Sequence, residues 1–239
     1  MRLFRTRTLC CVTETQSPEA QPIVADALAA AGIPVPKLGA CRGERLSPAE
    51  RALYVWILGR FALGENPSAG VVRDEAARLR LDFNRIREKL ASEDLIHFDA
   101  EGRIAVAYPF SGHPTPHRVS IDGHEAYAMC AIDALGIAPM LGLSIEIISH
   151  DPITSSEINV LLDADGTGTW RPQEAVVVAG RACDGAAFQG CCQVLNFFAS
   201  LESAQQYLGE REDVSGFPIT MPQAIELGRV IFGDVLRAR

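Results

Sequence analysis

The chain has 239 residues, 48% of them hydrophobic, which is enough to bury the core of one large domain or of a medium domain and a small one. This composition excludes a wholly disordered chain. Because 22 basic residues face 30 acidic ones, the net charge of -8 offers no overall attraction for nucleic acid phosphates or an anionic membrane surface. A small neutral or cationic ligand suits such a chain better.

Residues 1–45 are rich in Ala, Pro and Gly and are predicted to form an N-terminal arm that is partly helical, around "PIVADALAAAG". The apolar patch of "MRLFRTRTLCCVTETQ" is too short for a signal-peptide core, and the apolar region 126–148 is interrupted by Asp133, Pro139 and Glu146. We therefore predict a cytoplasmic protein that keeps its cysteines reduced, so that they are available as metal ligands, nucleophiles or core residues. The seven cysteines are Cys10, Cys11, Cys41, Cys130, Cys183, Cys191 and Cys192.

Residues 46–112 are predicted to form a winged-helix-like module. "LSPAERALYVWILGRFALG" begins a helix with Ser47 as N-cap and Pro48 at the first helical position. Two shorter helices follow in "SAGVVRDEAARLRL" and "DFNRIREKLASEDLI", the second capped by Asp82. "LIHFDAEGRIAVAYPF" then reads as two strands around a turn at 99–102.

The winged-helix layout raises the question of DNA binding, because the second helix of a helix-turn-helix lies in the major groove of DNA. The charge of this segment opposes that function, since a DNA reader usually carries an excess of Lys and Arg. Between residues 71 and 95 the basic residues (Arg73, Arg78, Arg80, Arg85, Arg87, Lys89) are matched by as many acidic ones (Asp74, Glu75, Asp82, Glu88, Glu93, Asp94). A packing module is the favoured interpretation.

Residues 113–239 are predicted to form an α+β domain with a small mixed or antiparallel sheet packed by helices. A helix is expected at 125–135, and two closing helices in "SLESAQQYLGE" and "MPQAIELGRVIFGDVLRAR". The linking stretch holds three histidines, but Pro114 and Pro116 oppose a helix that would align His113 with His117, and we expect no His metal site. Strands are predicted in "LSIEIISH", "EINVLLDA", "EAVVVAG" and "CCQVLNFFAS".

The stretch "AYAMCAIDAL" carries a thiol, Cys130, and a carboxyl, Asp133, three residues apart. In a helix this spacing puts both on one face, about one turn apart. Two interpretations remain open from the residues alone. In the first, Cys130 is an inert core thiol and Asp133 is hydrogen-bonded to a backbone N–H or an arginine. In the second, burial raises the pKa of the Asp133 carboxyl, which takes a proton from the Cys130 thiol and later gives it to another group.

The second thiol signal is "QGCCQVLNFFAS". If Cys191 and Cys192 lie in extended chain, their side chains point to opposite faces, so that only one joins a given site. Adjacent cysteines close a disulfide only with strain, which suits a metal or thiolate role better. The pair is a weak signal alone, and with Cys130 and Asp133 it suggests a centre of two thiols and one carboxyl.

With these motifs, the chain resembles bacterial organomercurial (alkylmercury) lyases. "YAMCAIDALGIAPMLG" resembles their active-site helix, "FQGCCQVLNFFASLESAQQYL" the segment with their second essential cysteine, and "MPQAIELGRVIFGDVL" their C-terminal helix. The likeness covers about residues 46–239. It implies that Cys130 and Cys191 are the catalytic, mercury-binding thiols and Asp133 the proton-handling carboxylate, with Cys192 a non-essential neighbour. Residues 113–239 would then be the lyase catalytic domain.

The resemblance implies protonolysis of a carbon–mercury bond, giving R–H and Hg²⁺ held by two cysteines. It implies no cofactor, an organomercurial substrate, external low-molecular-weight thiols for turnover and a mercuric reductase as partner, with no nucleic acid and no membrane. In this sequence Asp151 stands where the family has a structural cysteine after a Ser-His pair, and Cys10, Cys11, Cys41 and Cys183 have no counterpart. The alternatives are a non-catalytic soft-metal-binding or metal-sensing protein, a thiol redox protein, and a lyase-like enzyme for another organometal.

Overall fold

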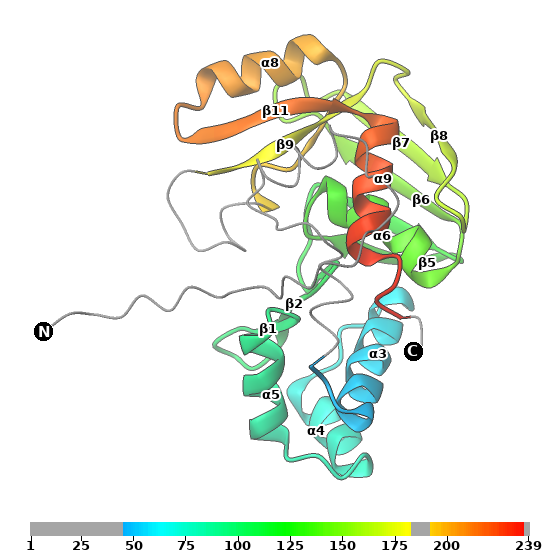
Figure 1. Cartoon of the computed structure of the whole chain (residues 1–239), viewed down its shortest axis with the longest axis vertical. Coiled ribbons are helices and arrows are strands. Elements are labelled where there is room, and N and C mark those ends of the chain that lie inside the picture. Colours follow the sequence, from blue (N-terminus) through cyan, green and yellow to red (C-terminus); the bar gives the residue numbers. More distant parts are fainter. Residues whose placement is uncertain (1–44, 183–191, 237–239) are drawn as a thin grey trace, which may run out of the picture.

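The computed structural model describes residues 45–182 and 192–236 as a mixed α+β structure with antiparallel sheets (Figure 1). The predicted arm at 1–44 lies outside these residues. The helices are α3 (Pro48–Ala62), α4 (Ala69–Arg78), α5 (Phe83–Ser92), α6 (Ala131–Leu141), α8 (Leu201–Glu210) and α9 (Met221–Phe232). The strands are β1 (Ile96–Phe98), β2 (Ile104–Ala107), β3 (Phe110–Ser111), β4 (Arg118–Ile121), β5 (His124–Ala128), β6 (Ile145–His150), β7 (Glu157–Leu162), β8 (Gly168–Arg171), β9 (Val176–Ala182), β10 (Phe197–Phe198) and β11 (Val214–Thr220).

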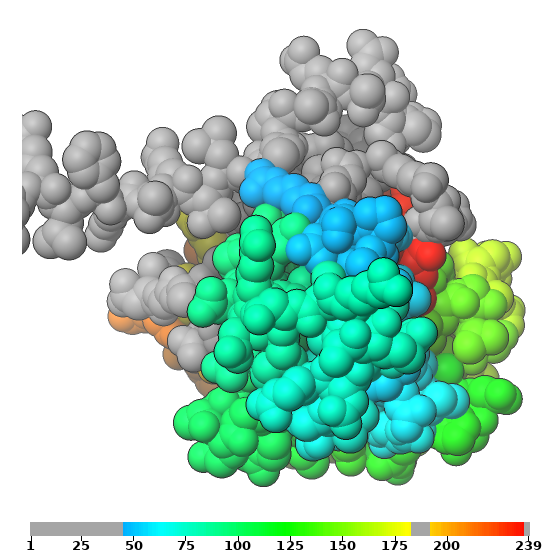
Figure 2. Space-filling model, turned by 90° about the horizontal axis from the view of Figure 1, so that it is seen from below, coloured from blue at the N-terminus to red at the C-terminus, as the bar shows by residue number. Residues whose placement is uncertain are grey.

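The first three helices begin where the sequence predicts. Ser47 caps α3 in a capping box, in which its backbone N–H donates to Glu50 Oε2 at 2.7 Å. Asp82 caps α5 by accepting the Arg85 backbone N–H at 2.8 Å. The three helices make up much of the face seen from below (Figure 2), and the β1–β2 hairpin follows them.

One large sheet links the helical module to the rest of the chain. Its strand order is β1-β2-β3-β5-β4-β6-β7-β8, and every neighbouring pair is antiparallel. The short strand β3 joins the two parts, because it pairs with β2 on one side and β5 on the other. The α3 ring Phe61 stacks on Phe110 of β3, with ring centroids 5.8 Å apart, so the module and the large sheet share a core.

A second sheet, of order β10-β9-β11, lies beside α8 (Figure 1). The helix packs its Ala204 and Tyr207 against Val178, Val194 and Phe198 in a small separate core. The sequence did not predict β11, which contains Pro218, nor β4 and β8. The predicted strand at 191–200 is largely wrong for its described residues, 192–200, because among them only Phe197–Phe198 forms a strand and Cys192 is helical.

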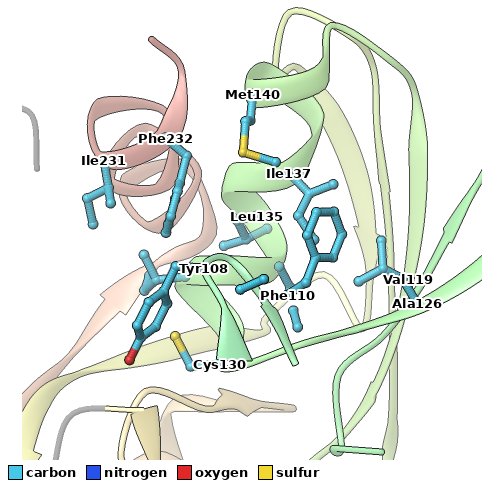
Figure 3. Packing of buried hydrophobic residues seen from close by; sticks show 14 of the residues in the cluster. Tyr108, Phe110, Val119, Ala126, Cys130, Leu135, Ile137, Met140, Ile231 and Phe232 are labelled. Atoms are coloured by element: carbon cyan, nitrogen blue, oxygen red, sulfur yellow. The ribbon is translucent and has the colours of Figure 1, made fainter. Parts of the chain in front are cut away.

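Helices α6 and α9 pack tightly against each other, and glycines at the crossing allow the close approach (Figures 1 and 3). A Cβ added at Gly228 of α9 would lie 2.8 Å from the Gly136 backbone N of α6. A Cβ at Gly136 would lie 2.3 Å from Phe232 Cδ2. Larger residues would push the helices apart, so this contact fixes α6, the helix at whose start Cys130 and Asp133 lie.

The prediction of one helix over 125–135 is wrong. β5 runs through Ala128 and pairs with β4 and β3, and α6 begins only at Ala131. Burial alternates over residues 125–128, as expected for a strand, because Ala126 and Ala128 are buried while Glu125 is exposed and Tyr127 is partly exposed. Cys130 therefore lies at the junction of a strand and a helix. No helix in the described residues is long and apolar enough to cross a membrane.

Candidate active site

Cys130 is the N-cap of α6, a position usually held by Ser, Thr, Asp or Asn. Its backbone is extended, and its Sγ accepts the backbone N–H of Asp133 at 3.4 Å. The sulfur thus lies at the positive end of the helix, where the dipole and free N–H groups favour a thiolate. The three residues that separate Cys130 from Asp133 are thus the distance from an N-cap to the third residue of its helix, and the two residues do not both lie inside the helix.

A second hydrogen bond joins Cys130 to the side chain of Asp133. The Cys130 thiol donates to Asp133 Oδ2 at 3.0 Å, and both residues are buried, with exposed fractions of 1% and 6%. A thiol proton can pass along this hydrogen bond to the carboxylate without a change of position. The sequence-based pairing of Cys130 with Asp133 is therefore matched by their geometry, although the helix that was to pair them begins later.

The third member of the cluster is Cys192, which comes from a distant part of the chain. Its Sγ lies 3.8 Å from the same Asp133 Oδ2, and one ligand atom of each of Cys130, Asp133 and Cys192 lies within 4.8 Å of the others. A backbone hydrogen bond of 2.8 Å from Ala131 N–H to Leu195 O ties the start of α6 to the segment that follows Cys192. Cys192 is partly exposed, whereas Cys130 is buried.

Burial is the main electrostatic influence on Cys130. It raises the pKa of this thiol well above its ordinary value, and the neighbouring Cys192 and Asp133 raise it further. Burial therefore favours the thiol form of Cys130, whereas the helix terminus favours the thiolate. A soft metal cation in the cluster would reverse this balance, because it supplies the positive charge that the buried site lacks.

Tyr108 is a site residue that the sequence did not indicate. Its hydroxyl lies 3.7 Å from Cys192 Sγ, and its side chain is buried at the same end of α6 as Cys130 (Figure 3). Its position depends on the pairing of β2, β3 and β5, and no spacing in the sequence relates residue 108 to residue 192. The only local sign is that Tyr108 and Pro109 interrupt an apolar strand.

The outcome for the predicted thiols is mixed. Cys130 and Asp133 lie together, whereas Cys191 lies outside the described residues, so its assignment as second thiol stays a prediction. The other unassigned cysteines (Cys10, Cys11, Cys41, Cys183) also lie outside them. Within 45–182 and 192–236, the sole group of ligand side chains able to hold a metal ion is Cys130, Asp133 and Cys192. His117 is buried instead against Ser149, with Nδ1 and Oγ 2.9 Å apart.

Asp151, which occupies the place of the expected structural cysteine, is a buried structural carboxylate. Its oxygens accept hydrogen bonds from four groups: Ile153 N–H, Thr154 N–H, Ala199 N–H and the Ser203 hydroxyl, at 2.8, 3.1, 2.8 and 2.6 Å. Burial opposes its ionisation, but these hydrogen bonds outweigh burial and lower the pKa of the carboxyl. Asp151 thereby ties the end of β6 to the start of α8, close to the strand β10 that follows Cys192.

Comparison with known proteins gives a consistent result. A family model described as alkylmercury lyase matches residues 110–233. An alkylmercury lyase of Staphylococcus epidermidis is 30% identical over 159 residues, which cover 66% of this chain and 72% of that protein. One from Bacillus cereus is 27% identical over 180 residues, 75% of this chain and 80% of that protein. The crystal structure of the mercury-bound form of MerB2 superposes with a TM-score of 0.65 at 20% identity, covering 80% of this chain and 94% of that one.

Proposed function

The chain belongs to the alkylmercury lyase family, and on that premise we propose that it cleaves carbon–mercury bonds by protonolysis with Cys130, Asp133 and one thiol of the Cys191–Cys192 pair. The observation that carries the proposal is a single carboxylate oxygen, Asp133 Oδ2, within 3.0 Å of one sulfur and 3.8 Å of another. An oxygen so placed can accept a proton from a thiol and then deliver it to a group bound between the sulfurs.

The proposed reaction begins when the sulfur of Cys130 binds the mercury of R–Hg⁺ and its proton passes to Asp133. The second thiol then binds mercury and releases its proton to solvent. Two thiolates place electron density on the metal and weaken the bond to carbon, for which soft sulfur ligands are well suited. Asp133 gives its proton to the carbon, the electron pair of the C–Hg bond forms the new C–H bond, and the products are R–H and Hg²⁺ held by two thiolates. Mercury is thus part of the substrate and not a resident cofactor.

For the second thiol, the geometry supports Cys192. Its sulfur lies 3.8 Å from Asp133 Oδ2 and close to Cys130, and the residue is partly exposed. The resemblance to the family favoured Cys191 and made Cys192 the dispensable neighbour. We therefore propose the mercury-binding role for Cys192, and Cys191, which lies outside the described residues, is the variant that tests the choice.

For the helical module, residues 46–112, a winged-helix-like packing role is supported by its contacts. Arg51 Nη2 of α3 donates to the backbone O of Val235 at 2.7 Å, which ties the module to the chain after α9. The hydroxyl of Tyr54 donates to the backbone O of Tyr108 at 3.2 Å, next to the cluster. Basic and acidic residues are equal in number between residues 71 and 95, so this segment carries no net positive charge for phosphates. We therefore propose no nucleic-acid partner.

Release of Hg²⁺ from two thiolates requires a competing ligand. Low-molecular-weight thiols are the proposed acceptors, because they match the softness of mercury. A mercuric reductase is the proposed protein partner. The mercury-bound form of the structurally similar MerB2 fits a product that stays on the protein until it is displaced.

The direct test is release of benzene from phenylmercury, or of methane from methylmercury, by the full chain with excess thiol. We expect hydrocarbon release that is lost in Cys130→Ser and in Cys192→Ser and retained in Cys191→Ser. Loss in Cys191→Ser with full activity in Cys192→Ser would return the second role to Cys191. No hydrocarbon from the wild-type chain, with stoichiometric Hg²⁺ binding intact, would favour a soft-metal-binding protein, and activity on a different organometal would change the substrate.

A further inference from the structure

The residues that follow Cys192 tie it to two neighbouring parts of the fold. The backbone O of Leu195 accepts the N–H of Ala131, the first residue of α6, at 2.8 Å. The backbone O of Asn196 accepts the N–H of Val178 in β9 at 3.1 Å. These two bonds hold the chain a few residues after Cys192, so the thiol keeps its place only if the residues between are also held.

The side chain of Asn196 supplies that connection. Its Nδ2 donates to the backbone O of Gln193 at 3.0 Å, a bond back along the chain of the kind that asparagine side chains make in turns. The Tyr207 hydroxyl of α8 donates to the same oxygen at a longer distance, 3.5 Å. Because Gln193 is the residue next to Cys192, the Asn196 amide carries the attachment at residue 196 back to the thiol.

The same side chain also reaches the segment that carries Cys130. A side-chain hydrogen bond joins Asn196 to His117, which is buried in the core. The backbone O of His117 accepts the N–H of Ala128, two residues before Cys130, at 3.0 Å. The His117 ring contacts Phe197 edge-on, with centroids 5.8 Å apart. Asn196 therefore lies between the two thiol-bearing segments and is hydrogen-bonded toward both.

The spacing of the two sulfurs matters for the proposed reaction. Once Cys130 has bound mercury, binding by Cys192 is an intramolecular step, and its probability depends on how narrowly the second sulfur is confined near the first. A loosened turn would spread Cys192 over more positions. A smaller fraction of the bound substrate would then have both sulfurs on the metal.

We propose that Asn196 is a positioning residue for the second thiol: its side chain, bonded to Gln193 O and to His117, holds Cys192 at the start of α6 before mercury binds. This inference rests on the proposed function of the cluster and adds to it a residue that the family resemblance does not assign. The amide does not ionise and exchanges no proton, so the proton balance of the reaction is unchanged.

The first test is Asn196→Ala, which removes both side-chain hydrogen bonds. We expect kcat for phenylmercury to fall about 10-fold and KM to change by less than about 3-fold, because capture by Cys130 is retained and only the second binding step is impaired. The matched control is Asn159→Ala in β7, where the amide donates to Glu157 Oε1 at 2.8 Å. This control should leave both constants unchanged.

A second readout needs no lyase turnover. The affinity for Hg²⁺ is measured by competition with dithiothreitol, counting only the bound equivalent that Cys130→Ser lacks. In Asn196→Ala we expect about 10-fold less dithiothreitol to displace the ion, because the second sulfur has a lower effective concentration, and in Asn159→Ala no change. A merely structural role of Asn196 would lower the thermal midpoint and leave this affinity unchanged at temperatures well below it.

Asn196→Asp keeps the size of the side chain and covers the case in which Asn196→Ala does not fold. Its carboxylate cannot donate to Gln193 O, yet its negative charge alone would strengthen binding of a cation, so weaker Hg²⁺ binding would report position rather than charge. Weaker binding is the expected result. An affinity in either folded variant that equals or exceeds that of the wild type, or an equal fall in Asn159→Ala, would overturn the role of Asn196. A wild-type chain that releases no hydrocarbon would overturn the proposed function instead, whatever the competition shows.

Discussion

Asp133 and Asp151 are both buried carboxyls in this chain, yet their surroundings differ in kind. Four donors surround Asp151, three backbone N–H groups and one hydroxyl, at 2.6 to 3.1 Å. Asp133 faces the sulfurs of Cys130 and Cys192, and its own N–H donates to the sulfur of Cys130, the N-cap of α6. The first set holds a fixed negative charge, whereas the second can itself give up protons.

The comparison separates structure from chemistry at two residues of one type. A carboxylate whose oxygens are filled by N–H donors stays ionised and stabilises the fold, because the donors cannot be deprotonated. A carboxyl beside thiols can exchange a proton with them, because a thiol loses its proton when a soft metal binds. Replacing each carboxyl should therefore have opposite consequences for activity and stability.

The largest expected effect is on catalysis. Asp133→Asn keeps the size of the side chain but cannot carry a proton to carbon, so we expect hydrocarbon release from phenylmercury to fall by about 10² to 10⁴. Stoichiometric binding of Hg²⁺ and the thermal midpoint are expected to change little. Retention of most of the activity in this variant would show that the proton reaches carbon by another route.

Asp151→Asn should show the opposite pattern. The amide nitrogen would face donors that now bond to a carboxylate oxygen, so we expect a loss of about 1–3 kcal/mol in the free energy of unfolding, measured with urea, and a much smaller change in activity. Because the folded pKa of Asp151 is lowered, its stabilisation is complete above the unfolded value of about 4 and is lost as pH falls below it. In Asp151→Asn, the free energy of unfolding should lack this pH-dependent contribution. Asp165→Asn, at an exposed turn, is the matched control, and equal destabilisation by both would remove the special role of Asp151.

His117 should have the smallest effect at neutral pH and a distinct one in acid. Burial lowers the pKa of this imidazole to about 4. Since the unfolded value is about 6.5, its neutral form stabilises the fold fully above pH ~6.5, and that contribution declines as pH falls from there toward 4. We expect a wild-type loss on the order of 1 kcal/mol between pH 7 and 5 in urea titrations. This loss should be absent in His117→Gln and unchanged in His150→Gln, where the histidine is exposed. A wild-type unfolding free energy that is flat over this range would contradict the prediction.

Local rules in the sequence anticipated a good part of these regions. The caps Ser47 and Asp82, the hairpin after α5 and the closing helices follow from residues that are neighbours in the chain. The error at 125–135 came from reading apolar content as helical, where pairing with β3 and β4 makes residues 124–128 a strand. β11 was missed because Pro218 argues against a strand, yet here it lies in an edge strand that, among the described residues, pairs with β9 only.

By itself, the sequence predicted that Cys130 and Asp133 lie close together, because side chains three residues apart meet both within a helix and at its N-cap. It also determined the family, through motifs around the cysteines. Only the tertiary structure decided that Cys192 meets this pair and that Tyr108 lies against Cys192. Those contacts join residues 59 and 84 positions apart, and they exist because the large sheet and the segment before β10 converge at the start of α6. No local pattern encodes such a meeting, since it depends on the packing of the whole core.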